Sequence, residues 1–466
     1  MFKFVGRYYF VIVMALFAVF KFPHLFLPYF WDEAWSYFPA IAEMAEKGPG
    51  LLPGALSLEE GKGHPLFFFW LTSTWISLNP GSLFFSRLLP LAISLALLFY
   101  SWHFARKTAG MAAGNLAITL LAVQSLFLAQ ATFLLPEVLL AFLLLVSADQ
   151  YIAGKFKWYA LAASLMVLTK ETAIVFVIFF LLWHILSHLD CKREKPLFSA
   201  DILLLGVPLL VYASWLVLHF LKFGTFFYSE HVGHIQFDKF NILMKLETAG
   251  KMVFIQYGRW LVTAATLLAT IWLLAKKRKS AHLRPLLMFV LLAALFMGFS
   301  AVNFYTQRYM MGMMALFIVT AGITIAQART GRLSIDLVAA AIMAAVPLYY
   351  SLTDRKSADS DLGFVEVTAV HHEMVRFCEQ NGWQNEPISS SFNMIFNLRD
   401  KRLGYLSGEP FTLVRDRKEL DSAKVFITES TGPESPETMD FVKQHFPHVK
   451  VFRNKHAYGE IYYKPD

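Results

Sequence analysis

The sequence predicts a polytopic α-helical membrane protein of about eleven membrane-spanning helices that ends in a small soluble α/β domain. Of its 466 residues, 56% are hydrophobic and only 16% are charged, and the apolar residues fall in long blocks. A hydrocarbon core of about 30 Å takes roughly 20 mostly apolar helical residues to cross, and a helix satisfies its own backbone there. The tail beyond residue 356 lacks such blocks and carries charged residues and short alternating runs instead.

Each predicted span is one of these apolar blocks, and the fifth is short. The blocks lie at about 8–28, 84–104, 111–130, 136–153, 158–169, 171–188, 201–221, 257–276, 284–303, 309–327 and 334–352. Lys and Arg gather in every second short connection, and such basic connections face the cytoplasm. These basic positions are Lys3, Arg7, Arg106, Lys107, Lys155, Lys157, Lys192, Arg193, Lys195, Lys276, Lys277, Arg278, Lys279, Arg329 and Arg332. The pattern predicts a protein of the cytoplasmic (inner) membrane with its N-terminus in the cytoplasm and its tail outside.

The first block is predicted to be a retained anchor. A cleaved signal peptide is the alternative, but the segment 22–31 that follows offers no small-residue cleavage site. Cys191 and Cys378 fall on opposite sides of the membrane, so we expect no disulfide between them within one chain. The net charge of +8 largely reflects the positive-inside bias and can also meet anionic membrane lipids. It does not argue for nucleic acid as a partner.

Two domains follow from this pattern, a transmembrane domain over 1–355 and a soluble extracytoplasmic α/β domain over 356–466. The transmembrane domain carries two long outer loops, at about 30–83 and 222–256, and loops of this length often carry function. In the first loop, amphipathic stretches at 34–46 and 65–78 predict helices along the membrane surface, joined by a Gly- and Pro-rich hinge. The tail predicts helices near 364–380 and 436–446 and strands near 387–392, 424–428, 449–453 and 458–463.

Asp32 and Glu33 are adjacent carboxylates at the outer end of the first span. An acidic pair at this depth is costly unless it is used. Helix capping is the alternative, because Asp and Glu suit the start of a helix. We favour a catalytic pair, since a cap needs one acid and the flanking Trp31 and Trp35 would desolvate both.

Further charged residues mark the outer starts of later spans. Glu137 follows Pro136, which also fits ordinary helix capping. Its position on the same outer side as Asp32 favours one cavity in which two carboxylates divide base and positioning roles. Lys170 and Glu171 lie between the fifth and sixth spans, where a local ion pair is the alternative.

Three more outer residues suit an anionic substrate. Lys62 and His64 stand among glycines in the segment 61–65, where the backbone can approach a phosphate closely. Arg308, next to Tyr309 in a tight outer turn, has a planar guanidinium that binds two phosphate oxygens at once. The alternative for Arg308 is an anchor that extends to the membrane surface.

His231 and His234 invite a metal interpretation. Two histidines and a glutamate in one loop are common without a metal, although other loops could supply further ligands. We therefore predict no metal site and no certain cofactor; a divalent metal is left open. The remaining residues describe an outward-facing cavity at the lipid boundary. Such a cavity suits a reaction on a phosphorylated lipid, in which a carboxylate takes a proton and cations stabilise the departing phosphate.

In order and sidedness these motifs resemble the GT-C glycosyltransferases of the protein O-mannosyltransferase and lipid A aminoarabinose transferase type (glycosyltransferase family 39-like). The resemblance covers roughly residues 1–350 and extends to the outer α/β domain at the end of the chain. Five segments carry it: Asp32-Glu33, His64-Pro65-Leu66-Phe67-Phe68-Phe69-Trp70, Leu135-Pro136-Glu137, Thr169-Lys170 and Gln307-Arg308-Tyr309.

The resemblance implies an inverting glycosyltransferase that moves a sugar from a polyprenyl-phosphate donor to a hydroxyl of an envelope acceptor, which is lipid A, a glycan or a protein. It implies Asp32 as the general base, with Glu33 and Glu137 positioning the donor or acceptor. Lys62, Lys170 and Arg308 would contact the lipid phosphate, and His64 and Tyr309 would line the same site. The sequence departs from the family pattern at Glu137, where Asp is more usual, and at His64, where Pro is.

Two alternatives belong to other classes. A transporter or lipid flippase would also need many spans and intramembrane charges. The two halves of this chain show no repeated pair of broken apolar segments, and the charges gather at one face, which favours an enzyme. A non-catalytic envelope scaffold that binds through its tail is the second alternative.

Overall fold

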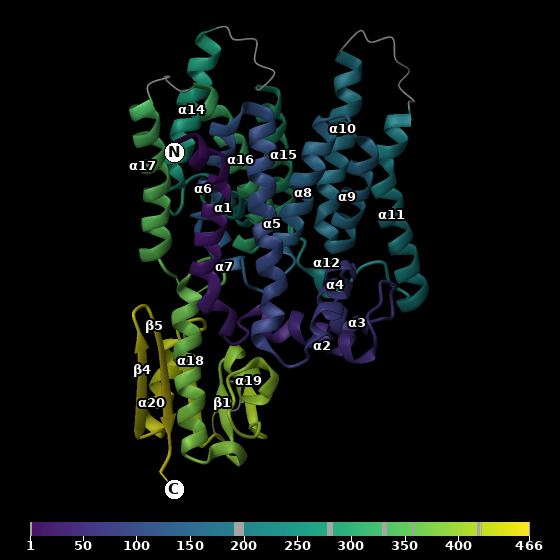
Figure 1. Ribbon diagram of the computed structural model, residues 1–466. Helices are drawn as coiled ribbons and strands as arrows, with labels where there is room; N and C mark the ends of the chain where they lie inside the picture. The colour runs from purple at the N-terminus through teal and green to yellow at the C-terminus, as the bar shows by residue number, and fades with distance from the viewer. Residues whose placement is uncertain are drawn as a thin grey trace.

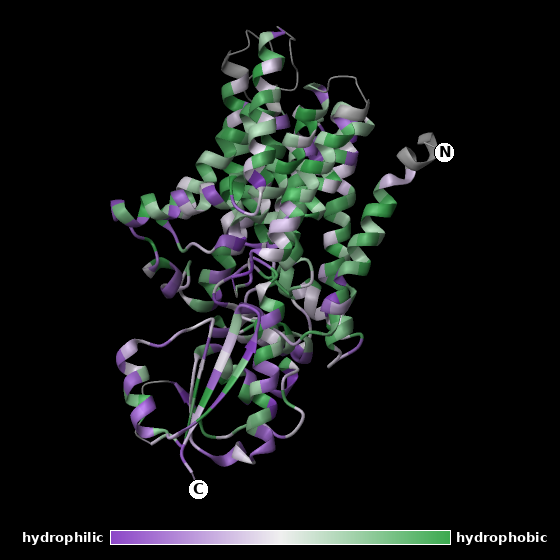
Figure 2. Ribbon diagram, turned by 90° about the vertical axis from the view of Figure 1, so that its left-hand side faces the viewer, coloured by the Kyte–Doolittle hydropathy of each residue, from purple (hydrophilic) through white to green (hydrophobic). Residues whose placement is uncertain are grey.

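The computed structural model describes residues 2–190, 200–276, 283–328, 333–356, 358–416, 420 and 422–465. A bundle of long helices forms one end of the molecule and a small sheet with its helices the other (Figure 1). Colour by hydropathy shows the same division, with apolar residues dominating the bundle and polar residues the sheet domain (Figure 2). Three of the six basic segments that predicted the orientation lie wholly or largely outside the described residues, at 192–195, at 277–279 and at 329 and 332, as does Cys191.

Every predicted apolar block contains a helix. These helices are α1 (Phe2–Lys21), α5 (Leu83–Ala109), α6 (Met111–Ala122), α7 (Ser125–Gln130), α8 (Glu137–Ile152), α9 (Phe156–Thr169), α10 (Ile174–Asp190), α11 (Ala200–Phe223), α14 (Arg259–Ala275), α15 (Leu283–Val302), α16 (Met311–Ala328) and α17 (Leu333–Thr353). The third block is broken at Val123 and Gln124 into α6 and α7. The predicted polytopic helical fold is therefore confirmed.

Fewer helices than eleven are long enough to span a bilayer unaided. Among the described residues, five are long and apolar enough by length and composition, at 8–26, 83–109, 200–223, 307–328 and 336–353. A sixth span arises if α13 (Lys239–Phe254) and α14, bent by 78° where they meet, are counted as one. The other apolar helices are shorter, so the number of crossings stays a prediction.

Helix α16 forms the centre of the bundle. It is apolar and buried from Met311 to Thr324, as expected for a helix that is covered on all sides. Its Gly322 lies against the backbone of Ala117 in α6, where an added Cβ would come within 3.1 Å. Close helix contacts through small residues are a general feature of membrane bundles.

The outer loops form short helices at the end of the bundle that faces the sheet domain (Figure 1). The first loop contains the 3-10 helix η1 (Phe22–Phe26), the π-helix η2 (Glu33–Tyr37), α2 (Phe38–Lys47), α3 (Leu58–Gly61) and α4 (Phe67–Ile76). The two predicted amphipathic helices thus correspond to η2 with α2 and to α4, and α3 was not predicted. The second loop contains α12 (Ser229–Gly233) and α13.

The tail folds as an α/β domain. Its elements are α18 (Gly363–Gln380), η5 (Trp383–Asn385), β1 (Ile388–Ser390), α19 (Phe392–Arg399), η6 (Lys401–Leu403), β2 (Val414–Asp416), β3 (Val425–Glu429), α20 (Pro436–His445), β4 (His448–Asn454) and β5 (Ala457–Tyr463). The sheet has the order β2-β1-β3-β5-β4. β1 pairs parallel with β2 and β3, whereas β5 pairs antiparallel with β3 and β4. Both predicted helices and all four predicted strands are present.

The tail domain packs directly on the first outer loop. The backbone N–H of Tyr29 donates to the carbonyl of Leu403 over 3.0 Å. The ring of Trp35 meets that of Phe392 edge-on, with centroids 5.3 Å apart. The wall of the outer cavity therefore has the tail domain behind it.

Candidate active site at the outer end of the bundle

A cavity of about 550 Å³ opens between the two outer loops, the ends of α11 and α15, and the segment 303–309 that precedes α16. Five of the eight residues predicted for the site line it: Asp32, Lys62, His64, Arg308 and Tyr309. The other three, Glu33, Glu137 and Lys170, are buried behind its wall. Much of the remaining lining is aromatic, including Phe226, Phe227, Phe296, Phe299 and Phe304.

Asp32 is held at the cavity wall by side-chain partners. Its Oδ1 accepts a hydrogen bond from Nε1 of Trp35 over 2.7 Å, and its Oδ2 pairs with Nη2 of Arg308. Although Asp32 precedes the π-helix η2, its side chain makes no capping bond to that helix. The capping alternative therefore does not describe what this carboxylate does. Its side chain retains 19% exposure and so stays open to the cavity.

Glu33, by contrast, points away from the cavity and is completely buried. It forms a two-pronged ion pair with Arg87, with Nη1–Oε1 and Nη2–Oε2 distances of 3.0 and 2.9 Å. The backbone N–H groups of Leu134 and Phe30 also donate to its carboxylate. The structure thus places Glu33 in a brace between the first outer loop and the start of α5 and does not bring it to the cavity.

Arg308 is the centre of the charged cluster. Each of its three nitrogens meets a different carboxylate: Nη2 meets Asp32, Nη1 meets Oδ2 of Asp359 at 2.5 Å and Nε meets Oε1 of Glu137 at 3.2 Å. The guanidinium is only 2% exposed, yet it lines the cavity. Asp359 comes from the segment between α17 and α18. Burial raises the pKa of this carboxyl, and the neighbouring Arg308 opposes that shift.

Lys170 and Glu137 form the layer behind Arg308. Nζ of Lys170 donates to Oε1 of Glu137 over 2.9 Å and lies 3.7 Å from the centre of the Tyr309 ring. Oε2 of Glu137 is buried and has no hydrogen-bond partner among the described residues. Lys170 therefore stabilises the carboxylate of Glu137 and the ring of Tyr309. Of these three residues, only Tyr309 lines the cavity.

Lys62 approaches the cavity from the first outer loop. Its backbone is in the left-handed region, with φ of +46°, and that of the following Gly63 is too, with φ of +68°. Its Nζ stands 4.5 Å above the ring of Trp35. A cation–π contact of this kind leaves the ammonium free to bind an anion.

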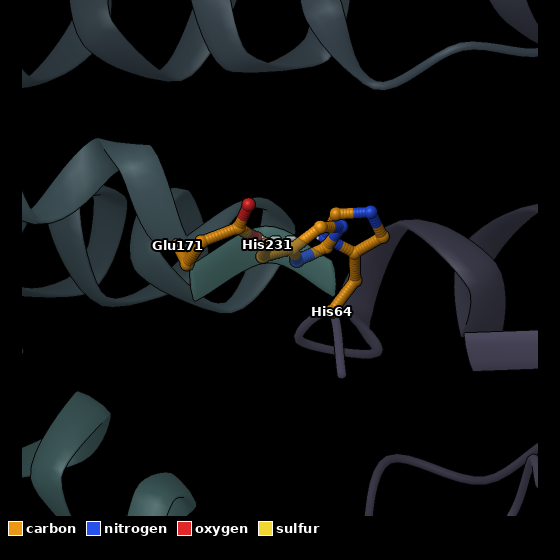
Figure 3. A group of neighbouring side chains, drawn as sticks. All are labelled: His64, Glu171 and His231. Carbon is orange, nitrogen blue, oxygen red and sulfur yellow. Dashed lines mark hydrogen bonds and ion pairs between the residues drawn. The ribbon is translucent and has the colours of Figure 1, made fainter. Parts of the chain in front are cut away.

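Three side chains from separate segments converge at another part of the cavity, as Figure 3 shows: His64, Glu171 and His231. Nδ1 of His64 lies 2.9 Å from Oε2 of Glu171, and one ligand atom from each residue falls within 4.8 Å of the others. Burial and the neighbouring His64 lower the pKa of His231 to about 4, so its ring is neutral at pH 7. Two imidazoles and a carboxylate are a donor set that suits Zn²⁺. The sequence prediction of no metal site considered His231 with His234, whereas the structure places His231 beside His64.

Sequence reasoning did not single out two residues of this network. Arg87 had a readable signal, because it is a lone charge within an apolar block. Asp359 had none, since it follows the last span in the polar segment 358–361, which resembles any surface turn. Its role depends on a contact 51 residues away in the sequence.

The fold and the site define a class: a multi-pass membrane protein that carries, at the end of the bundle next to the tail domain, a cavity lined by aromatic and charged residues. No protein-family model and no curated protein matches the sequence. The structure is similar to that of ArnT from Cupriavidus metallidurans in the apo state, with a TM-score of 0.59 and 15% identity over 97% of both chains. For ArnT bound to undecaprenyl phosphate, the values are 0.56 and 16%, again over 97% of both chains. This chain therefore has the GT-C fold of ArnT.

Proposed function

We propose that this chain is an inverting glycosyltransferase. It moves a sugar from a polyprenyl-phosphate-linked donor to a hydroxyl of an envelope acceptor on the outer face of the cytoplasmic membrane. The observation that carries the proposal is the placement of Asp32 and Arg308 side by side on the wall of one cavity. A carboxylate so placed can accept the proton of the acceptor hydroxyl, while the cation stabilises the phosphate that leaves the sugar.

The lining of the cavity suits an amphiphilic anion. Its aromatic residues fit an isoprenoid chain, while Arg308 and Lys62 supply positive charge for the phosphate. The ArnT structure with undecaprenyl phosphate supports a lipid of this class, because that protein shares the fold along nearly the whole chain.

The chemistry is a single displacement. The acceptor hydroxyl oxygen attacks the anomeric carbon as its proton passes to the carboxylate of Asp32. The bond between that carbon and the phosphate oxygen breaks, and the polyprenyl phosphate leaves with the bonding electrons. A carboxylate in hydrogen-bond reach of the hydroxyl is a suitable base. Fixed cations that stabilise the leaving phosphate lower the barrier without reorganising.

The buried residues take supporting roles in this proposal. Glu137 and Lys170 fix Arg308 and Tyr309 from behind, and Glu33 with Arg87 fixes the loop that carries Asp32. This assignment differs from the roles that the family resemblance implies, in which Glu33 positions a substrate and Lys170 touches the phosphate. Lipid A, a glycan and a protein hydroxyl are all acceptors that this chemistry accommodates.

The test is transfer from a panel of radiolabelled polyprenyl-phosphate sugars by purified protein in lipid nanodiscs. Wild type is compared with Asp32→Asn and with Glu59→Gln, an exposed acid of the same loop outside the cavity lining. We expect wild type and Glu59→Gln to release polyprenyl phosphate and Asp32→Asn to lose at least about 10²-fold in rate, as for loss of a general base. Equal rates for all three proteins would remove Asp32 from the reaction. No turnover with any donor would favour a transporter.

A further inference from the structure

The segment that leads from the last membrane helix into the tail domain delivers a carboxylate to the active site. Asp359, in this segment, pairs with Nη1 of Arg308, and its side chain is only 7% exposed. Unlike Asp32, it does not line the cavity. It therefore contacts the guanidinium from outside the space that a substrate would fill.

The segment itself is held firmly in place. Nε2 of Gln130, at the end of α7, donates to the backbone carbonyl of Asp359 over 2.7 Å. Asp361, two residues on, accepts from the hydroxyl of Tyr257 over 3.0 Å and from the N–H of Gly363 over 2.7 Å. The first helix of the tail domain then begins, and its Phe364 packs on Phe133, with ring centroids 4.7 Å apart. These contacts fix where the Asp359 carboxylate stands.

The geometry points to Asp359 as a positioning residue for the transfer reaction. We infer that it holds the Arg308 guanidinium so that one edge faces the cavity and Asp32 keeps a single contact with it. The inference rests on the proposed function, in which Arg308 binds the phosphate of the donor. It also gives the tail domain a part in catalysis, since the domain's attachment carries Asp359.

The net charge of the cluster around Arg308 distinguishes a positioning role of Asp359 from a structural one. With all five groups ionised, the cluster of Asp32, Glu137, Asp359, Lys170 and Arg308 carries one negative charge in excess. Removing the charge of Asp359 makes the cluster neutral, which favours a phosphate, but it leaves Arg308 free to turn towards Asp32. Binding and turnover therefore change in different directions, and a merely structural defect does not produce that split.

The experiment compares the kcat and KM of Asp359→Asn with those of wild type, in the nanodisc assay with a donor that wild type uses. We expect kcat to fall about 10- to 100-fold, the scale of a misplaced catalytic group, while KM stays equal or falls. Glu366→Gln is the control, because this buried acid of α18 pairs with Arg355 and Lys455, and neither residue belongs to the cavity cluster or to the contacts that hold Asp359. It should lower the thermal unfolding temperature and leave kcat unchanged.

A double-mutant cycle tests whether Asp359 acts through Arg308. In an Arg308→Lys background, Asp359→Asn should cause no further loss of kcat. In an Arg308→Gln background, it should raise the unfolding temperature, because it removes a buried acid that has lost its partner; this readout needs no turnover.

Three outcomes would overturn the inference: a wild-type kcat for Asp359→Asn, independent losses that multiply in the double variant, or a lower unfolding temperature in the Arg308→Gln background. If wild type transfers no sugar from any donor, the proposed function itself fails and takes this inference with it. If wild type transfers sugar and Asp359→Asn does so equally well, only the positioning role of Asp359 is overturned.

Discussion

Two adjacent residues of one motif can have different roles. Asp32 and Glu33 were predicted as one catalytic pair, but a single step along the chain turns their side chains to opposite sides of the loop. Asp32 reaches the cavity, whereas Glu33 is enclosed by Arg87 and two backbone N–H groups. The sequence reveals the cost of an acid at this depth but not which side chain faces which way.

The buried Glu33–Arg87 ion pair should stabilise the folded protein only while both partners are present. Glu33→Gln leaves the Arg87 guanidinium buried without a counter-charge, and breaking such a pair costs about 3–5 kcal/mol. We expect a clearly lower thermal unfolding temperature in nanodiscs. Glu43→Gln is the control, because its pair with Lys47 is exposed and such pairs contribute about 0–1 kcal/mol. Equal effects of the two substitutions would contradict a bracing role for Glu33.

The cluster of His64, Glu171 and His231 is predicted to bind a divalent metal. After chelator treatment, wild type should bind Zn²⁺ in a calorimetric titration. His231→Ala should weaken that binding at least about tenfold, because it removes one ligand of three. His234→Ala is the matched control, since that ring packs on Phe304 and is not in the cluster. Zn²⁺ binding that His231→Ala does not change would show that the ion sits elsewhere.

At the scale of elements, periodicity predicted every long helix of the bundle and missed several short elements. All eleven apolar blocks contain helices, and the tail's two predicted helices and four predicted strands are present. Strand β2 has three residues and α19 has eight. Such short segments carry too little pattern to stand out from a loop. The break between α6 and α7 leaves little mark in hydropathy, because only the polar Gln124 and Ser125 interrupt the apolar residues on either side of it.

Helix packing predicts unequal effects of adding one methyl group. Gly322→Ala in α16 places a Cβ 3.1 Å from backbone atoms of Ala117, which cannot move aside as a side chain could. Overpacking of this kind costs about 1–3 kcal/mol, so the unfolding temperature should fall. Gly298→Ala in α15 meets no atom within 4 Å and should be neutral or stabilising, since Ala favours a helix over Gly. A stabilising Gly322→Ala would show that α6 and α16 lie further apart than the structure places them.

At the scale of the whole molecule, the cavity and the tail domain lie at the same end of the bundle, remote from the basic connection that carries Lys155. The proposed reaction requires this end to face outwards, where donor and acceptor meet. The positive-inside pattern predicts the same orientation from independent residues. A single measurement of which side of the membrane the tail domain lies on therefore tests both the proposed reaction and the predicted orientation.

Single cysteines can supply that measurement once Cys191 has been replaced by Ser, because Cys378 is buried. Lys443→Cys lies on an exposed turn of α20 in the tail, and Lys155→Cys is exposed in the connection between α8 and α9. In intact spheroplasts, a membrane-impermeant maleimide should label position 443 and leave position 155 unlabelled, whereas detergent should expose both. The reverse pattern would place the cavity in the cytoplasm. Asp32 and Arg308 would then face nucleotide-linked donors, and a polyprenyl-phosphate donor used outside the membrane would no longer fit the molecule.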